Sequence, residues 1–418
     1  MNLWCPLSGL SVKKYYFLLL LAALTGAVTG VICSVFGKGL LFIESFRNEH
    51  LFVLVPFLAP AGVLLVKAYH KWGGQCHRGM GLVFETGAGE SSYLPRRFLP
   101  FAFLSTWLTH FFGGSSGREG VAVQIGASVG FNLGEISGDM KMRKLLLLCG
   151  MAAGFSGLFG TPFAAVFFAL EVLYAGRIAY EAIIPVGISS IVAFAMHHLL
   201  GLHEEKAVLT ELSAYDLPTV LRVAGAAVCF SLVGQLFARL LEQCKNKWFH
   251  RLFPNPAWRI FALGALVSVL SLLIHRGRYS GLGLAINEAV YTGNGSVYAY
   301  DWILKLIFTV LTLGAGFQGG ELTPMFCIGS SFGFVIAPLF NLPPSFCAAL
   351  GYCAVFGSAT NTLFAPIIVG CEAFGFEHFP LFSVACMVSY ALNGNYSIYQ
   401  KQRKYESFIH VTSQKPKS

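Results

Sequence analysis

The sequence has few charged residues and lacks the short motifs of nucleotide-driven or zinc-dependent proteins. Only 12% of its 418 residues are charged, whereas a soluble domain carries roughly a quarter. It contains no G-x-x-x-x-G-K-[ST] loop, no H-E-x-x-H and no dinucleotide-binding fingerprint. ATP-driven transport and membrane proteolysis therefore lack their usual residues, and we expect a protein that is not an enzyme.

The cysteines and histidines also lack the spacing of a metal or disulfide site. The eleven cysteines include no C-x-x-C pair, and most are scattered through apolar runs, as Cys33, Cys229 and Cys386 are. The eleven histidines form no spaced cluster. We therefore interpret the cysteines as small apolar side chains and expect no metal and no cofactor.

Hydrophobic residues are abundant instead. They make up 55% of the chain, and the mean hydropathy is +0.65. The first apolar run, Tyr15 to Gly37, follows two lysines and exceeds the roughly 20 residues needed to cross a lipid bilayer. It has no cleavage signal, so we predict a retained helix and a polytopic membrane protein.

The formal net charge of +9 does not indicate a nucleic-acid partner, because the basic residues lie in loops and tails. They concentrate at the two ends of the chain, at Lys13, Lys14, Lys401, Arg403, Lys404, Lys415 and Lys417. By the positive-inside rule both termini are cytoplasmic, which requires an even number of crossings. We expect a multi-pass protein of the inner cell membrane.

The chain divides into two similar halves. Residues 79–82, 117–130 and 150–171 match residues 281–284, 320–333 and 351–372, in the same order and about 200 residues apart. We predict a first transmembrane half at 1–200, a polar linker at 201–217, a second transmembrane half at 218–400 and a basic tail at 401–418, with no soluble regulatory domain. Duplicated halves of this length are typical of transporters, with the second half inverted. The predicted fold is all-α, with two antiparallel halves of tilted and broken helices.

The segment Gly113 to Gly130, GGSSGREGVAVQIGASVG, places a glutamate where a helix is expected to restart. Glycines at 113, 114, 117 and 120 allow the chain to break within the membrane. The free N–H groups of a new helix form an anion site, and Glu119 is an anion attached beside it. We hypothesise that Glu119 competes with a mobile anion. The alternative is a salt bridge to Arg118, but neighbouring residues usually point apart, so we expect Arg118 to set the local potential.

The image of this segment in the second half is GGELTPMF, Gly319 to Phe326. Glu321 is either a favourable charge at a helix N-terminus or a second proton carrier. Thr323 either caps the helix or donates a hydrogen bond to a small anion. Met80 offers almost nothing to an anion, and composition alone favours a packing role for it. Tyr399 on composition alone is a membrane-interface tyrosine, and Glu171 and Glu372 are expected at helix ends.

These motifs resemble those of the CLC family of chloride channels and anion/proton antiporters. GREGV at Gly117 to Val121 is similar to the family's GREGP, GGELTP at Gly319 to Pro324 to its GGIFAP, and SIYQ at Ser397 to Gln400 to the segment with its central tyrosine. The resemblance implies that Glu119 is the external gating glutamate and that Tyr399 binds the central ion. It also implies an anion site around Gly117, Arg118, Gly120 and Val121, and assembly as a homodimer.

Several departures from the family pattern resemble its CLC-F branch of bacterial fluoride/proton antiporters. Met80 replaces a serine donor, Glu321 replaces an isoleucine and Thr323 stands where alanine is common. Val172 occupies the position of the family's internal proton glutamate, and Val121 replaces a proline. Phe84 and Phe326 are either apolar lining or ring edges that face fluoride.

The sequence therefore predicts a fluoride exporter that exchanges F⁻ for H⁺ across the lipid bilayer, gated by Glu119 and helped on the inner side by Glu321. The alternative is a chloride/proton antiporter or a passive chloride channel of the same fold. A membrane scaffold that transports nothing is a further alternative, which anion flux from vesicles would exclude.

Overall fold

The computed structural model describes residues 11–202, 209, 215–293 and 295–404. Much of the predicted polar linker, and all of the predicted basic tail after Lys404, lie outside these residues. The first half contains the helices α1 (Val12–Glu49), α2 (Leu51–Leu54), α3 (Leu58–Ala68), α4 (Met80–Ala88), α5 (Phe98–Phe111), α6 (Glu119–Leu133), α7 (Met140–Phe159), α8 (Pro162–Glu171) and α9 (Ile183–Leu199).

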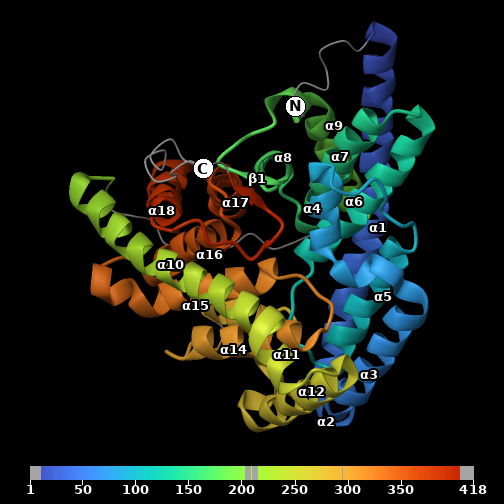
Figure 1. The fold of residues 1–418 in the computed structure, drawn as a ribbon. Coiled ribbons are helices and arrows are strands. Elements are labelled where there is room, and N and C mark those ends of the chain that lie inside the picture. The colour runs from blue at the N-terminus through green and yellow to red at the C-terminus, as the bar shows by residue number, and fades with distance from the viewer. Residues whose placement is uncertain (1–10, 203–208, 210–214, 294, 405–418) are drawn as a thin grey trace, which may run out of the picture.

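The second half contains a corresponding series of helices. These are α10 (Leu217–Gln243), α11 (Phe249–Leu252), α12 (Pro256–Leu273), α13 (Leu284–Thr292), α14 (Asp301–Ala315), α15 (Leu322–Ile336), α16 (Pro344–Thr360), α17 (Phe364–Phe374) and α18 (Phe379–Ala391). Two short parallel strands, β1 (Tyr174–Ala175) and β2 (Arg403–Lys404), attach the end of the described chain to the first half. Figure 1 shows most helices of the first half on one side of the molecule and most of the second half on the other.

Seven helical segments in the described part of the chain are long and apolar enough to cross a membrane. They are Val12–Glu49, Leu51–Arg78, Met140–Phe159, Tyr180–Leu199, Leu217–Leu252, Pro256–Leu273 and Leu322–Phe340. Other helices are too short to cross a membrane, as expected where the sequence predicts a break in a helix. The apolar run from Leu145 to Tyr174, for example, is divided between α7 and α8. The predicted first helix over the apolar run Tyr15 to Gly37 is confirmed, and it is part of the longer α1, which continues to Glu49 and buries the ion pair between Glu44 and Arg47.

Small residues allow the central helices to approach closely, and the two halves do this in the same way. In the first half, a Cβ atom added to Gly126 of α6 would overlap the carbonyl oxygen of Gly150 in α7. In the second half, Gly329 of α15 meets the carbonyl oxygen of Gly351 in α16 in the same manner. Close backbone approach at small residues is how helices associate in lipid, where burial of apolar surface supplies little driving force.

Two glutamates at matching positions of the repeat join the halves to each other. Glu171, at the end of α8, accepts hydrogen bonds from the backbone N–H groups of Leu363, Phe364 and Ala365 at 3.2, 3.2 and 2.8 Å. Glu372, in α17, accepts from the N–H groups of Phe163 and Ala164 at 3.0 and 2.8 Å. Each carboxylate thus satisfies free donors at the start of a helix in the other half, which confirms the expected role at helix ends.

Replacing Glu171 with glutamine is expected to destabilise the protein by about 2–3 kcal/mol, because one of the two accepting oxygens becomes an NH₂ group that faces buried N–H donors. The midpoint of thermal unfolding in detergent should fall. Glu377→Gln is the matched control, since the side chain of Glu377 is 68% exposed. An equal midpoint for the two variants would contradict a capping role for Glu171.

Candidate functional site

The two glycine-rich breaks meet at the centre of the molecule. Gly117 and Gly320 exchange two backbone hydrogen bonds, of 2.6 and 2.7 Å, in a short antiparallel pairing. Directly after this contact α6 begins at Glu119 and α15 begins at Leu322. The N-termini of two broken helices, one from each half, therefore lie next to each other, and their free N–H groups make the region favourable for an anion.

The carboxylate of Glu119 lies within this region and is fully buried. It accepts a hydrogen bond from the hydroxyl of Thr323, which belongs to the opposite half. Thr323 Oγ1 in turn accepts from the backbone N–H of Arg118 at 3.1 Å. The threonine hydroxyl therefore binds a negative charge at this position and does not cap its own helix. An anion in place of the carboxylate would meet the same donor.

Arg118 forms an ion pair with Glu119, with 3.4 Å between Nε and Oε1. The expectation that the two side chains point apart is wrong: Arg118 is the residue just before α6, and its side chain turns back to the carboxylate of Glu119. Both groups are almost fully buried, so the pairing offsets part of the cost of removing each charge from water.

The glycines of the first motif are required by the contact between the halves. A Cβ atom at Gly117 would lie 2.6 Å from Thr323 Oγ1, and one at Gly120 would lie 3.3 Å from the Cα atom of Gly320. The same position at Gly120 is 3.5 Å from Oε2 of Glu321, which places that second carboxylate beside the first turn of α6. Val121, in contrast, is 2% exposed and packs in an apolar cluster.

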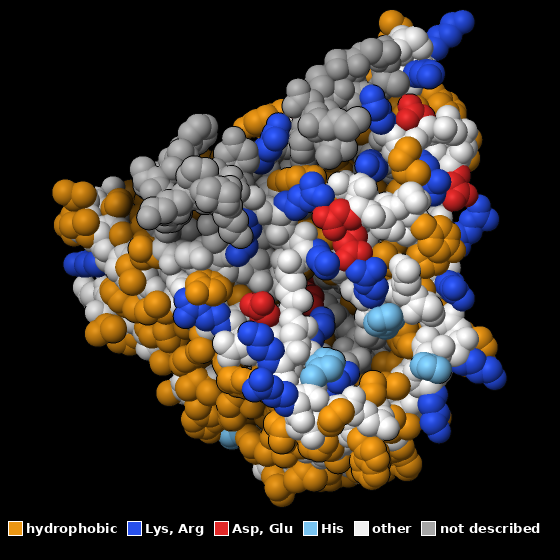
Figure 2. Space-filling view, in the orientation of Figure 1, with side chains coloured by type: hydrophobic (Ala, Val, Ile, Leu, Met, Phe, Trp, Pro, Cys, Tyr) orange, Lys and Arg blue, Asp and Glu red, His pale blue; other side chains and the backbone are white. Residues whose placement is uncertain are grey.

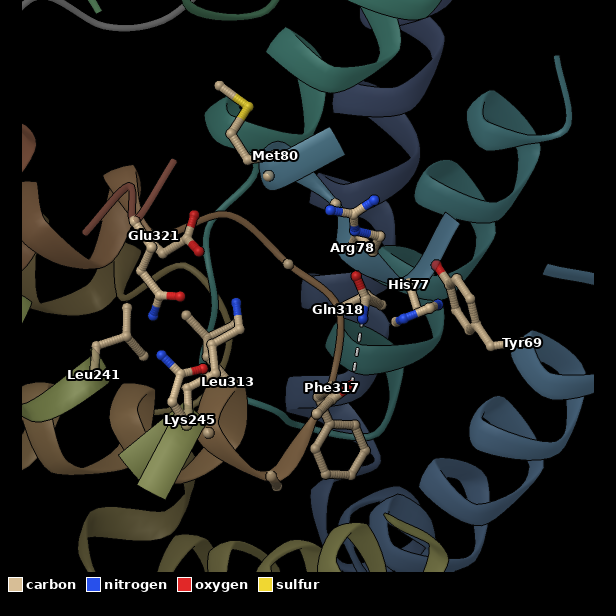
Figure 3. Close-up of a pocket in the computed structure, with 18 of the residues that line it drawn as sticks. Tyr69, His77, Arg78, Met80, Leu241, Lys245, Leu313, Phe317, Gln318 and Glu321 are labelled. Atoms are coloured by element: carbon tan, nitrogen blue, oxygen red, sulfur yellow. Dashed lines mark hydrogen bonds between the residues drawn. The ribbon is translucent and has the colours of Figure 1, made fainter. Parts of the chain in front are cut away.

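Glu321 differs from Glu119 because it faces a cavity. It immediately precedes α15, and its side chain forms no capping hydrogen bond to that helix. The cavity has a volume of about 720 Å³, and Met80, Phe84 and Tyr399 line it together with Glu321. In Figure 3, Glu321 lies on one side of this cavity and Tyr69, His77 and Arg78 lie on the other, with Met80 above them. One carboxylate is thus enclosed between the halves, and the other borders open space.

The walls of the cavity carry several basic side chains. Figure 2 shows a hollow on this face of the molecule with basic and histidine side chains around it. The basic and histidine residues that line it are His70, His77, Arg78, Lys245, His250, Arg259 and Lys401. Arg259 is 9% exposed, and its Nη1 atom has no hydrogen-bond partner among the described residues. Such an arrangement favours the entry of anions.

Tyr399 and Phe84 form one wall of the cavity. Their ring centroids are 4.9 Å apart, and the buried hydroxyl of Tyr399 has no hydrogen-bond partner in the described part of the chain. The segment is held by Gln402, whose amide donates to the carbonyl oxygen of Val172 at 3.0 Å. Val172 is fully buried. The tyrosine hydroxyl is therefore available to a ligand, as its predicted role requires.

Met80 is the first residue of α4 and is 7% exposed. It follows Gly79, whose φ of +51° is a conformation that favours glycine and allows the helix to begin abruptly. Phe326 is fully enclosed by aromatic rings: it stacks nearly parallel to Tyr352 at 4.1 Å and to Phe159 at 5.5 Å. A third ring, Phe356, packs edge-on with it at 5.1 Å, and Phe326 is not among the residues that line the cavity.

Sequence reasoning missed two buried polar side chains near the site, Lys305 and Gln124. Lys305 in α14 donates to Ser115, just before the site, and Gln124 in α6 lines the cavity. A single lysine within the apolar run from Ile303 to Gly316 was the available signal, since charges within a membrane segment are costly and usually functional. Within the described residues no group of three or more metal-binding side chains comes together.

A polytopic helical protein with paired broken helices that meet at a buried carboxylate belongs to the class of ion-transporting membrane proteins. The family description "Voltage gated chloride channel" matches residues 61–394. The chain therefore belongs to the voltage gated chloride channel family.

Individual relatives cover almost the entire chain. A "Chloride/fluoride channel protein" of Pseudomonas syringae pv. tomato is 35% identical over 94% of this chain and 87% of its own length. The crystal structure of a CLC-type fluoride/proton antiporter is 44% identical, with a TM-score of 0.93 over 95% of this chain and 100% of that one. A slow cyanobacterial Cl⁻/H⁺ antiporter, 22% identical with a TM-score of 0.79 over 91% of this chain and 96% of its own, shares the fold.

Proposed function

We propose that the protein is a fluoride/proton antiporter that exports F⁻ in exchange for H⁺. The observation that carries the proposal is the position of Glu119, held by the hydroxyl of Thr323 between the N-termini of two broken helices. A carboxylate in that position excludes a mobile anion while it is charged and admits one after protonation. The similarity to a fluoride/proton antiporter at 44% identity supports the choice of ion.

The exchange follows from the two carboxylates. Protonation of Glu119 removes its charge and weakens its hold on Thr323, so that fluoride replaces it and accepts the same hydrogen bond. Return of the charged carboxylate expels the anion and completes the cycle. Glu321 borders the cavity beside Gly120, and it passes the proton between the cavity and the buried site. Tyr399 and the ring edges of Phe84 and Phe326 contact fluoride on the way.

The orientation and assembly are part of the same proposal. The protein lies in the inner cell membrane with both termini in the cytoplasm, so the cavity that contains Lys401 opens to the cytoplasm. Its basic side chains collect fluoride there. The protein acts as a homodimer with one pathway in each subunit, and it carries out transport without an enzymatic reaction, a metal or a cofactor.

Efflux from proteoliposomes tests the proposal. Vesicles loaded with F⁻ or with Cl⁻ are followed with an ion-selective electrode and a pH electrode, with and without an imposed pH gradient. We expect F⁻ efflux that drives proton uptake and is much faster than Cl⁻ efflux. Faster chloride efflux would favour the alternative, a chloride/proton antiporter or chloride channel, and no anion flux would favour a membrane scaffold.

Met80→Ser tests the basis of the selectivity. Serine at the start of α4 adds a hydroxyl donor to the wall of the cavity where the thioether offers none. One hydrogen bond to a charged group contributes about 1.5 kcal/mol, so the ratio of chloride to fluoride flux should rise on the order of tenfold. Met80→Leu, which adds no donor, is the control. The assay is the same efflux measurement, and an unchanged ratio in Met80→Ser would refute this role.

A further inference from the structure

Lys305 is a fully buried lysine in α14 that the transport cycle described above does not use. Its Nζ atom donates three hydrogen bonds: to the carbonyl oxygen of Gly281 at 2.7 Å, to Ser115 Oγ at 3.0 Å and to the carbonyl oxygen of Tyr279 at 3.2 Å. All three acceptors are neutral. The ammonium group is therefore hydrogen-bonded, and it forms no ion pair with a carboxylate of the described residues.

A buried charge without a counter-charge is costly. Glu44, whose Oε1 atom lies beside Gly281, uses that oxygen to pair with Arg47 at 3.2 Å and to accept from the N–H of Leu282 at 3.3 Å, and its Oε2 atom forms no hydrogen bond to Lys305. An apolar side chain of similar length would avoid the desolvation cost of the ammonium group, and such replacements of buried charges are often neutral or stabilising. Burying a lysine here costs more free energy than burying an apolar side chain would. Stability alone therefore does not explain the lysine, which points to a role in function.

The three acceptors belong to two loops that lead into broken helices. Ser115 lies in the loop 113–117, which leads to Glu119 at the start of α6. Tyr279 and Gly281 lie in the loop before α13, and the N–H of Gly281 donates to the carbonyl oxygen of Gly114 at 3.0 Å. Lys305 therefore connects the entry segment of the gating glutamate in one half with an entry segment in the other half.

Two threonines of α14 extend this contact. Lys305, Thr309 and Thr312 lie on one face of the helix, at spacings of four and three residues. Thr309 Oγ1 lies 3.0 Å from Ser115 Oγ, and Thr312 Oγ1 accepts from the N–H of Ser115 at 3.1 Å. Ser115 is thus bound at both its backbone and its side chain, just before the Gly117–Gly320 contact.

Comparison of the two repeats shows that only the second half has a lysine at this position. Lys305 precedes Gly320 by 15 residues, and the residue that precedes Gly117 by 15 is Ala102. Packing shared by both halves does not account for a charge that only the second half carries. The two halves also differ at the site itself, where Glu119 is enclosed and Glu321 borders the cavity. The loop that Lys305 holds is the one that leads to Glu119.

We propose that Lys305 is a positioning residue for the gate: it fixes the loop 113–117 so that the carboxylate of Glu119 stays on Thr323 and blocks the anion path between protonation events. Without this anchor the loop moves, the carboxylate leaves the site without a proton and fluoride passes uncoupled. The consequence for coupling rests on the proposed exchange of fluoride for protons, whereas the anchoring of the loop does not.

The test uses the full-length protein with Lys305→Met, which keeps the length of the side chain and removes the three hydrogen bonds. Amide hydrogen exchange measures the loop without any transport assay. We expect exchange in residues 113–120 to rise on the order of tenfold, as for the loss of one hydrogen bond to a charged group, with α16 unchanged. In proteoliposomes the number of fluoride ions moved per proton should rise.

Ser115→Ala provides a milder variant, since it removes one acceptor of Lys305 and leaves the charge in place. We expect a smaller increase both in the amide exchange of residues 113–120 and in the number of fluoride ions moved per proton. If Lys305→Met does not fold, this variant is used for the test instead. Lys71→Met, at an exposed position, is the control. Unchanged loop exchange and coupling, or exchange that rises equally throughout the protein with coupling unchanged, would overturn the proposal. A wild-type protein that moves no fluoride would refute the proposed function alone, because the exchange measurement still decides the role of Lys305.

Discussion

Glu119→Gln is expected to abolish fluoride-driven proton movement while fluoride continues to leave the vesicles. The glutamine amide is neutral at every pH and has no titrating proton, so it cannot carry H⁺ across the site. It also lacks the negative charge that holds Glu119 on the hydroxyl of Thr323 and in the ion pair with Arg118. The side chain therefore resembles the protonated gate, and we expect passive fluoride efflux without coupling.

The measurement is simultaneous recording of F⁻ efflux and H⁺ uptake in proteoliposomes. Proton uptake should fall by about two orders of magnitude, the usual range for loss of a positioned proton-transfer group. Glu135→Gln is the control, because Glu135 is a surface residue paired with Arg96 and Arg143 and lies away from the site. Proton uptake in Glu119→Gln at the level of this control would exclude Glu119 as the gate.

The position of the two helix starts could be predicted from the sequence because local rules determine it. Glycines around Arg118 and Glu119 permit a chain break, and their repeat image at Gly319 and Gly320 predicts a second break. The structure confirms that α6 begins at Glu119 and α15 at Leu322. Matching glutamates at the helix ends were also predictable, since an unsatisfied helix N-terminus in a membrane requires an acceptor.

Contacts between residues about 200 positions apart could not be predicted in this way. No local rule indicates that Thr323 donates to Glu119 instead of capping α15, because the choice depends on how the halves meet. The ion pair of Arg118 with its neighbour likewise depends on burial. The last turns of α1 carry Glu44 and Arg47, whose charges contact partners in distant segments: His110 in α5 and Leu282 before α13.

Glu321→Gln is expected to reduce both fluoride efflux and proton uptake, on the order of 100-fold for the proton. This outcome differs from that of Glu119→Gln, because the gate remains intact. Glu119 still requires a proton before it leaves Thr323, and the carboxylate that borders the cavity beside Gly120 no longer supplies one. The site therefore stays closed, and uncoupled leakage of fluoride is not expected.

The double variant of Glu119 and Glu321 separates this explanation from simple damage to the pathway. If Glu321 acts by delivering protons to Glu119, its loss has no further effect once the gate is neutral, and the double variant should leak fluoride like Glu119→Gln alone. Glu242→Gln is the matched control, because Glu242 also lines the cavity but lies on α10, away from the paired helix starts. A double variant without fluoride efflux would show that Glu321 is needed for the anion path itself, and full fluoride-driven proton uptake in Glu321→Gln would exclude it as a proton carrier.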